Sequence, residues 1–308
     1  MSEKIEIAGI GACVADTLYR LEKFPPEDTK LRAVESKMAG GGPVATGLVA
    51  AAKQGCQTAF LGVLGSDAAG QFLIQDFEKY GVETGHIVSY NKQYRSFTSC
   101  IWLNDGAGSR TCVFDKGNLP AYVPDETALE ALKQAKLLMV DGNEMGAAIE
   151  GSKSIHSAGG KVLYDAGGLY PDVERLLPLV DILIPSAEFA KGITGAEQIE
   201  EAAKILYQTY SPEVVVITDG KEGGILYQGE KVIHYPAFPV KVVDSNGAGD
   251  TFHGAFAAAA VKGFSYLSCC ILASMTSALK CMGFGARESI PDFDSVIAAL
   301  KREGVEVL

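Results

Sequence analysis

Short apolar runs alternate with longer helical patterns along this chain, and that alternation limits the folds open to it. Strand–helix–strand units join parallel strands through helices that pack on the sheet. The sequence therefore predicts an α/β fold with a mainly parallel central sheet. The predicted strands are Ile5–Ala8, Thr58–Val63, Leu137–Val140, Lys161–Tyr164, Ile182–Ile184 and Val214–Thr218, and the predicted helices are Pro43–Gln54, Asp67–Tyr80, Glu126–Gln134, Met145–Ala158 and Ala196–Tyr210.

Two stretches interrupt this alternation. Thr17–Ser36 carries no long helical pattern, and Tyr94–Lys116 reads as a β-hairpin. The hairpin strands are Ser96–Leu103 and Arg110–Phe114, around a turn at residues 104–108. We expect both stretches to form a small β-sheet lid, from about residues 12–36 and 94–117. No linker or repeat divides the chain, which predicts one domain over residues 1–308.

Charge and composition argue against several kinds of partner. A net charge of -11 argues against a nucleic acid or an anionic membrane as the main partner. No apolar run approaches the roughly 18 residues that a membrane helix needs, and residues 1–6 lack a signal pattern. Seven cysteines without a Cys-x-x-Cys pair indicate buried, reduced thiols in a cytoplasmic protein.

A glycine turn between two patterned segments has the character of an anion site. Val240–Val243 reads as a strand, and Phe252–Lys262 reads as a helix closed by Gly263. Gly247-Ala248-Gly249 therefore falls at a strand-to-helix junction. Small residues let backbone amides approach a ligand, and the start of a helix carries partial positive charge.

Asp250 follows these small residues at once, at the opening of the helix. A carboxylate beside an anion hole suits a base that takes a proton from an attacking hydroxyl while amides stabilise a phosphoryl group in transfer. A second interpretation is an acid that merely favours the first helical turn.

The segment Asp244–Phe252 resembles the second signature of the ribokinase-like, or PfkB, family of carbohydrate kinases, Asp-Thr-x-Gly-Ala-Gly-Asp-x-Phe. Ser245 is a mild departure from that pattern. The resemblance implies an ATP-dependent sugar kinase with a three-layer fold and a β-sheet lid, in which Asp250 is the base and residues 247–249 supply the amides. ATP and Mg²⁺ are the implied cofactors, and a homodimer through the lid is the implied assembly.

Further segments extend the resemblance to the sugar site. Met38–Pro43 resembles the family's first Gly-Gly motif, which implies that Gly41 and Gly42 form a hinge and contact the sugar. Asp16 matches the acid that binds sugar hydroxyls. Thr46 stands where many members have a sugar-binding Asn, so we expect this shorter side chain to recognise a different hydroxyl pattern.

The resemblance also implies nucleotide and cation sites. The nucleotide residues are Thr218, Gly220, Gly223 and Ser277. Asp244, Gly285 and Ser289 are the implied surroundings of a potassium ion. Ser186-Ala187-Glu188-Phe189 departs from the family's Asn-x-x-Glu motif, because Glu188 lies one residue early. Glu188 either acts on Mg²⁺ through water or is a plain surface acid.

The substrate class is the least determined property. Residues 40–46 and 278–281 look closest to the sulfofructose kinase branch, and Lys30 sits where that branch places a sulfonate-contacting lysine. The branch's sulfonate-binding Arg falls near Asn143, which is not basic. We therefore expect phosphorylation of a primary hydroxyl on a neutral hexose or pentose, fructose- or ribose-like, with Lys30 otherwise a solvated lysine.

Four other functions compete with that of a sugar kinase. A nucleoside kinase and a sugar-acid kinase share the fold, and a non-catalytic binding relative would retain it without the reaction. A dinucleotide-binding oxidoreductase is disfavoured, because Gly9-Ile10-Gly11 is not followed by the third glycine and Val14 stands there.

Overall fold

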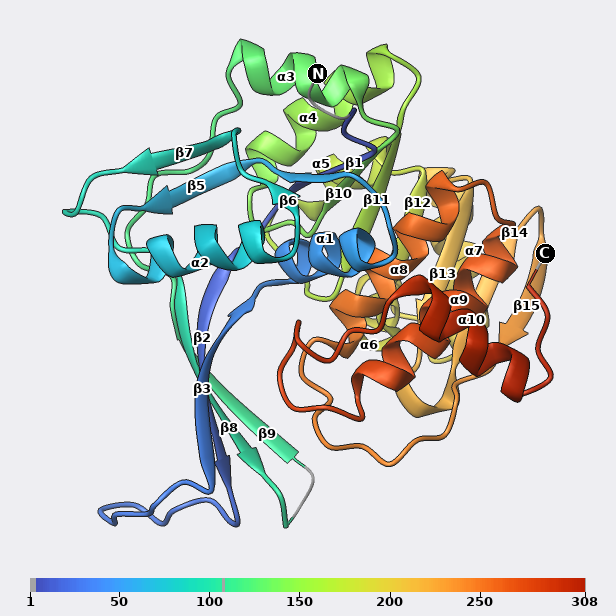
Figure 1. The fold of residues 1–308 in the computed structure, drawn as a ribbon. Coiled ribbons are helices and arrows are strands. Elements are labelled where there is room, and N and C mark those ends of the chain that lie inside the picture. Colours follow the sequence, from blue (N-terminus) through green and yellow to red (C-terminus); the bar gives the residue numbers. More distant parts are fainter. Residues whose placement is uncertain (1–3, 107–108, 308) are drawn as a thin grey trace.

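A nine-stranded sheet forms the centre of the molecule, as seen in a computed structural model that describes residues 4–106 and 109–307 (Figure 1). All neighbouring pairs are parallel except the two that join β13 to β14 and β14 to β15. The mainly parallel α/β fold is therefore confirmed. In spatial order the strands are β15 (Lys231–Tyr235), β14 (Gly224–Gln228), β13 (Val214–Thr218), β12 (Ile182–Pro185), β11 (Lys161–Ala166), β10 (Leu137–Val140), β1 (Ile7–Ile10), β4 (Thr58–Phe60) and β6 (Val82–Glu83).

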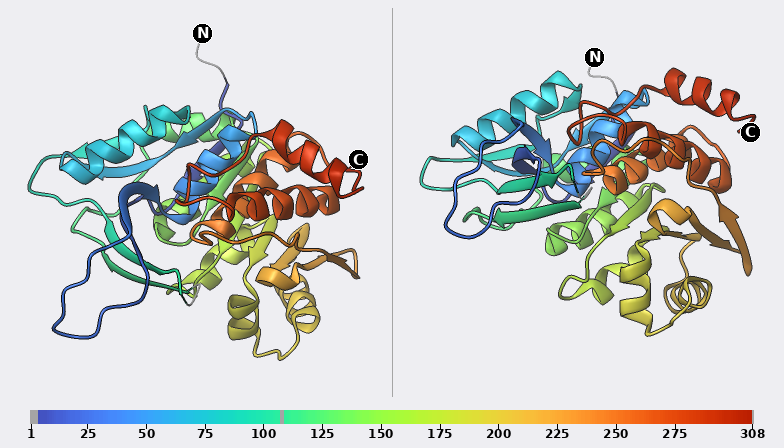
Figure 2. Two further views of the ribbon diagram at one scale, coloured as in Figure 1. Left: turned by 60° about the horizontal axis from the view of Figure 1, so that its bottom comes forward. Right: turned by 90° about the horizontal axis from the view of Figure 1, so that it is seen from below.

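Helices cover both faces of this sheet, which gives three layers (Figure 2). The alternation of side chains in β10 shows why: Leu137 and Met139 join one buried cluster, and Leu138 and Val140 join the other. One layer contains α1 (Pro43–Lys53), α2 (Ala68–Lys79), α8 (Ala248–Val261), α9 (Tyr266–Lys280) and α10 (Phe293–Arg302). The other contains α3 (Glu126–Gln134), α4 (Met145–Ser157), α5 (Val173–Leu176), α6 (Ala187–Thr194) and α7 (Ile199–Tyr210).

A second, four-stranded sheet extends away from the main body (Figure 1). Its order is β3 (Glu35–Gly41), β2 (Val14–Leu21), β8 (Thr98–Asn104) and β9 (Ser109–Asp115). The first stretch runs to Gly41 rather than to residue 36, because residues 38–41 pair with β2 along its whole first half. The predicted hairpin is present, although residues 107 and 108 of its turn lie outside the described residues. β5 (Gly62–Gly65) and β7 (Ile87–Tyr90) form a separate pair.

The predicted strand Val240–Val243 is wrong. These residues form an irregular segment, with Val242 and Val243 exposed. β15 ends at Tyr235, and Pro236 and Pro239 follow it, so no ladder continues into the segment. The backbone N–H groups of Val243 and Asp244 donate instead to the Cys281 carbonyl, at 2.8 and 3.1 Å.

Two smaller expectations are also corrected. Helix α8 begins at Ala248, four residues before the predicted start at Phe252, so the glycine turn leads directly into the helix. Cys112 is exposed, whereas five of the seven free cysteines are buried as expected. Within the described residues, no helix combines the length and the apolar character that crossing a membrane requires.

Candidate active site

The first turn of α8 lies at the carboxyl-terminal edge of the main sheet, where ligands bind in open α/β folds. Gly247 precedes the helix with φ of 75°, a left-handed conformation that glycine adopts without strain. Amides in a first helical turn lack acceptors within the helix. The Ala248 amide donates to the Ser245 carbonyl at 3.2 Å, so the amides of Gly249 and Asp250 are the better placed donors for an anion.

Asp250 lies in this first turn, and burial raises the pKa of its carboxyl group. The nearby Asp141 carboxylate adds to that rise, whereas His253, Arg110 and Lys280 oppose it. Arg110 belongs to β9, so the small sheet brings a positive charge towards Asp250. A raised pKa makes a carboxylate a stronger base towards a hydroxyl proton.

His253 fixes the position of that first turn. Its Nδ1 lies 2.7 Å from the Gly249 carbonyl oxygen, and its Nε2 lies 3.0 Å from the Ile184 carbonyl oxygen. Asp165, the buried acid near the end of β11, places Oδ2 3.2 Å from Nδ1. Burial raises the pKa of Asp165 to about 7. Neither His253 nor Asp165 was among the residues predicted from the sequence.

Asp141 is a second buried acid that the sequence analysis missed. It follows β10, and its Oδ2 accepts from the amides of Ala12 and Val44 at 2.8 and 3.2 Å. Its Oδ1 accepts from the Asn143 amide at 3.0 Å. Burial raises the pKa of Asp141, and these amide donors oppose the rise. The carboxylate therefore joins the start of α1 to the turns after β1 and β10.

Asp16, Gly41 and Gly42 come together as predicted, at the base of the small sheet. The buried Asp16 carboxylate accepts from Ser99 Oγ at 2.6 Å, and burial raises the pKa of Asp16 to about 6. A Cβ on Gly41 would collide with Asp16 Oδ2. Gly42 has φ of 91°, and a Cβ there would collide with the Ala12 carbonyl. Gly42 is thus required by its backbone conformation and by the close Ala12 backbone, and Gly41 by the close approach of the Asp16 carboxylate.

Asn143 lies beside this group, in a hollow of about 150 Å³. Its Nδ2 donates to Asp141 Oδ1 at 3.2 Å and to the Tyr170 hydroxyl at 3.1 Å, which fixes the orientation of the amide. Phe97 and Lys116 line the same hollow. The hollow joins the turn after β1 to the hairpin and the loop after β10.

Thr46 lies next to this group, because its backbone amide donates to the Gly42 carbonyl at 2.9 Å, whereas Lys30 does not reach the group. Thr46 is fully buried in α1, and its hydroxyl accepts from Arg287 Nε at 3.5 Å rather than facing a hollow. Lys30 is exposed in the loop between β2 and β3, beyond the pair of Arg20 and Glu35. The four residue-to-residue steps of β2 from Asp16 to Arg20 separate it from the site by roughly 13 Å of strand.

A cavity of about 460 Å³ collects the predicted nucleotide residues. Thr218, Gly220, Gly223 and Ser277 all line it. Apolar side chains such as Phe238 and Val242 form most of its wall, and Ala248 and Gly249 also line it. Its volume lies within the usual range for cofactor sites. The Ser277 hydroxyl donates to the Ala248 carbonyl at 2.8 Å, joining α9 to the anion site.

Glu188 does not line this cavity; it is exposed in the first turn of α6. Ser186 pairs with Thr218, so α6 begins beside the nucleotide cavity. Asp244, Gly285 and Ser289 do come together. The Gly285 amide donates to Asp244 Oδ2 at 2.9 Å, and the Ser289 hydroxyl donates to the Gly285 carbonyl at 3.0 Å. Among the described residues, no group of three or more His, Cys, Asp or Glu side chains is arranged to hold a metal ion.

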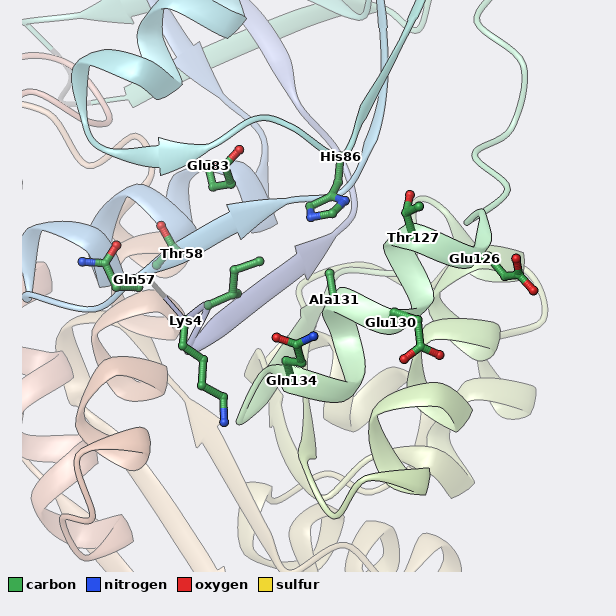
Figure 3. Close-up of a pocket in the computed structure, with 11 residues that line it drawn as sticks. Lys4, Gln57, Thr58, Glu83, His86, Glu126, Thr127, Glu130, Ala131 and Gln134 are labelled. Carbon is green, nitrogen blue, oxygen red and sulfur yellow. The ribbon is translucent and has the colours of Figure 1, made fainter. Parts of the chain in front are cut away.

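A second hollow, of about 960 Å³, lies at the opposite edge of the sheet (Figure 3). Residues before β1, β4 and β10 line it, including Lys4, Gln57 and Gln134. None of the predicted site residues reaches it.

The sequence pattern of the pfkB family carbohydrate kinases matches residues 4–292. The chain belongs to this family. Ribokinase of Arabidopsis thaliana is 30% identical over 304 residues, covering 95% of this chain and 80% of that protein. Ketohexokinase of Mus musculus is 26% identical, covering 96% of this chain and 100% of that protein.

A solved structure shares the architecture. The Arabidopsis thaliana ribokinase complexed with ribose and ATP superposes with a TM-score of 0.85 at 29% identity, over 96% of this chain and 99% of that one. The ribokinase-like fold is therefore confirmed, and the PfkB protein described here is an ATP-dependent carbohydrate kinase.

Proposed function

We propose that this PfkB kinase transfers the γ-phosphoryl group of ATP to a primary hydroxyl of a neutral, fructose- or ribose-like sugar, with Asp250 as the base. One observation carries the proposal: Asp250 and the amides of the first turn of α8 lie between the 460 Å³ nucleotide cavity and the group formed by Asp16, Gly41 and Gly42. The Coulombic influence of Asp250 on Asp16 supports that proximity.

In the proposed reaction, each side of the site has its own task. Asp16 and Asn143 orient the sugar through its hydroxyls. Asp250 takes the proton of the attacking hydroxyl, and the amides of Gly249 and Asp250 stabilise the charge on the transferring phosphoryl group. The small sheet brings the charge of Arg110 towards Asp250, and closure of this sheet over the site would limit access of water. We infer that this sheet is the predicted lid of the single domain.

Mg²⁺ would enter with the ATP phosphates and neutralise their charge. Glu188 is the carboxylate predicted to act on Mg²⁺, and its exposure in α6 suits a contact through water. The remote position of Lys30 and the non-basic Asn143 disfavour a sulfonated substrate. The similarity to a ribokinase and a ketohexokinase favours a sugar over a nucleoside.

An ADP-release screen tests this function. The purified protein is given ATP, Mg²⁺ and, separately, ketohexoses, aldopentoses, sugar acids, sulfosugars and nucleosides. We expect release of ADP with a fructose- or ribose-like sugar. Release with a nucleoside alone would refute the proposed substrate class, and the same screen with Asp250→Asn protein gives the background.

Sugar binding should depend on pH through Asp16. The pKa of its carboxyl group is raised to about 6, so this group is a carboxylate, and an acceptor for sugar hydroxyls, above that pH. As the pH falls below about 6, protonation should raise the KM for sugar by roughly tenfold per unit. The KM for ATP serves as the control and should stay flat. A sugar KM that does not change between about pH 8 and about pH 5 would contradict this role.

The outer face of the small sheet favours a homodimer. Register places Met38, Thr17, Cys100 and Val113 in one row across the four strands, on the face opposite to Asp16. Met38 is 50% exposed and Val113 is 66% exposed. An apolar face of this kind typically marks an interface. We expect sedimentation velocity to give twice the chain mass, and Val113→Glu to give the single mass; a wild-type monomer at micromolar concentration would contradict the assembly.

A further inference from the structure

The loop formed by residues 283–290 lies beside Asp244, because the Gly285 amide donates to Asp244 Oδ2. Resemblance to the PfkB family assigned this region to a potassium ion, so its oxygen atoms are the candidate ligands. Hard monovalent cations need several such oxygens directed at one point. Whether the chain fits such an ion depends on what those oxygens already accept.

Lysine ammonium groups bind four of the eight carbonyl oxygens of this loop. Lys37 Nζ donates to the Phe284 carbonyl at 2.6 Å. Lys53 Nζ donates to the carbonyls of Arg287, Glu288 and Ile290, at 3.0, 3.0 and 2.8 Å. The Gly285 carbonyl accepts from the Ser289 hydroxyl. The loop is therefore held by cations that belong to the chain itself.

Asp244 is occupied in the same way. Its Oδ1 accepts from the Asn246 amide at 2.8 Å, and its Oδ2 accepts from the Gly285 amide. Its backbone carbonyl accepts from Lys280 Nζ at 2.8 Å. All three oxygen atoms of Asp244 therefore accept a hydrogen bond, and so does the Gly285 carbonyl.

Lys280 is the exceptional member of this set, because its side chain is fully buried, with 0% exposure. A buried ammonium group requires compensating charge. Lys280 is the last residue of α9, where the helix dipole favours a cation. Burial lowers the pKa of Lys280, and the nearby carboxylates of Asp244 and Asp250 favour its charged form. The ammonium group therefore lies in the field of the two acids that bound the anion site.

We propose that the Lys280 ammonium group takes the place of the monovalent cation. It holds the Asp244–Asp250 segment in position through the Asp244 carbonyl, so the enzyme needs no potassium ion. A potassium ion at Asp244 would have to compete with Lys280 for the same carbonyl and would be repelled by its charge. Lys280 acts through Asp244 and is a positioning residue. The inference rests on the proposed function of the Asp250 site.

The test compares the wild type with Lys280→Ala in potassium chloride and in N-methylglucamine chloride at equal ionic strength. Both kcat and the melting temperature are measured, and Lys204→Met, an exposed lysine change on α7, is the control. We expect the wild type and the control to show no specific response to K⁺ in either quantity. In Lys280→Ala, kcat without K⁺ should fall, and K⁺ should raise it by about tenfold and raise the melting temperature.

The kcat and melting temperature of the wild type test the proposal even if Lys280→Ala fails to fold. A rise of the wild-type melting temperature that is specific to K⁺ overturns the proposal, and so does activation of the wild type by K⁺. Full activity of Lys280→Ala without K⁺ also overturns it. The melting temperatures need no substrate, so a failure of this inference is distinguishable from a protein that phosphorylates no sugar at all, which would refute the proposed function.

Discussion

Replacement of Asp250 by Asn should lower kcat by roughly 10²- to 10⁴-fold, because the amide cannot take the proton of the attacking hydroxyl. The substitution changes neither the shape of the first turn of α8 nor the lining of the nucleotide cavity. ATP affinity, measured by calorimetry, should therefore stay close to that of the wild type. Steady-state kinetics with a sugar that supports ADP release gives kcat.

Asp294 provides a matched control for this change. It is an exposed acid in the first turn of α10, where its negative charge favours the start of the helix. Asp294→Asn should leave kcat unchanged. If Asp250→Asn also turned over near the wild-type rate, Asp250 would be only a first-turn acid of the same kind, and its assignment as the base would be wrong.

The second large effect is expected at Arg287, which is almost fully buried between three elements. Its Nη1 donates to Asp76 of α2 at 2.5 Å, and its Nη2 donates to the Gly41 carbonyl at 2.8 Å. The guanidinium lies 5.1 Å from the centre of the Phe77 ring. Arg287→Met leaves Asp76 as an unpaired buried charge, which should lower the free energy of unfolding by about 3–5 kcal/mol. Urea denaturation measures the change.

A double variant separates the charge from the packing. Arg287→Met with Asp76→Leu removes both charges of this pair, so stability should return to near the wild-type value. If the free energy of unfolding of the double variant fell by the sum of the two single losses, Arg287 and Asp76 would not be a coupled pair.

The stable double variant should still bind sugar poorly. It has lost the donor to the Gly41 carbonyl, and it has lost the positive charge that lowers the pKa of Asp16. We expect a raised KM for sugar and a shift to higher pH of the point at which that KM rises. An unchanged sugar KM would show that Arg287 serves stability alone.

Local patterns were sufficient for six of the nine strands of the main sheet and for helices α1, α2, α3, α4 and α7, whereas β6, β14, β15 and helices α5, α6, α9 and α10 were not predicted. β10, β13 and α3 have the predicted bounds, because each is a short run with clear periodicity and clear ends. The strand prediction for Val240–Val243 was wrong, since β-branched residues form a strand only where a neighbouring strand supplies hydrogen-bond partners. Here the backbone of Val243 found its partner in Cys281, at the end of a helix.

The candidate site was predictable only where glycine and acid stand in a motif. Arg287 and Asp76 are 211 residues apart, and no local pattern connects them. Asp141 and Asp165 did carry a signal, because each is an acid at the end of an apolar run and therefore at the ligand-binding edge of a parallel sheet. Thr46 was placed at the substrate by its position in the Gly-Gly helix, but the helix turns that side chain towards Arg287.

The central claim, transfer of a phosphoryl group from ATP to a sugar hydroxyl, is tested most directly by the fate of the γ-phosphate. The protein is incubated with γ-labelled ATP, Mg²⁺ and a fructose- or ribose-like sugar, and the products are separated and analysed by phosphorus NMR. We predict a labelled sugar phosphate with the ester at a primary carbon, formed in step with ADP. Label found only in inorganic phosphate, or in a nucleoside phosphate when nucleosides are added, would contradict the account.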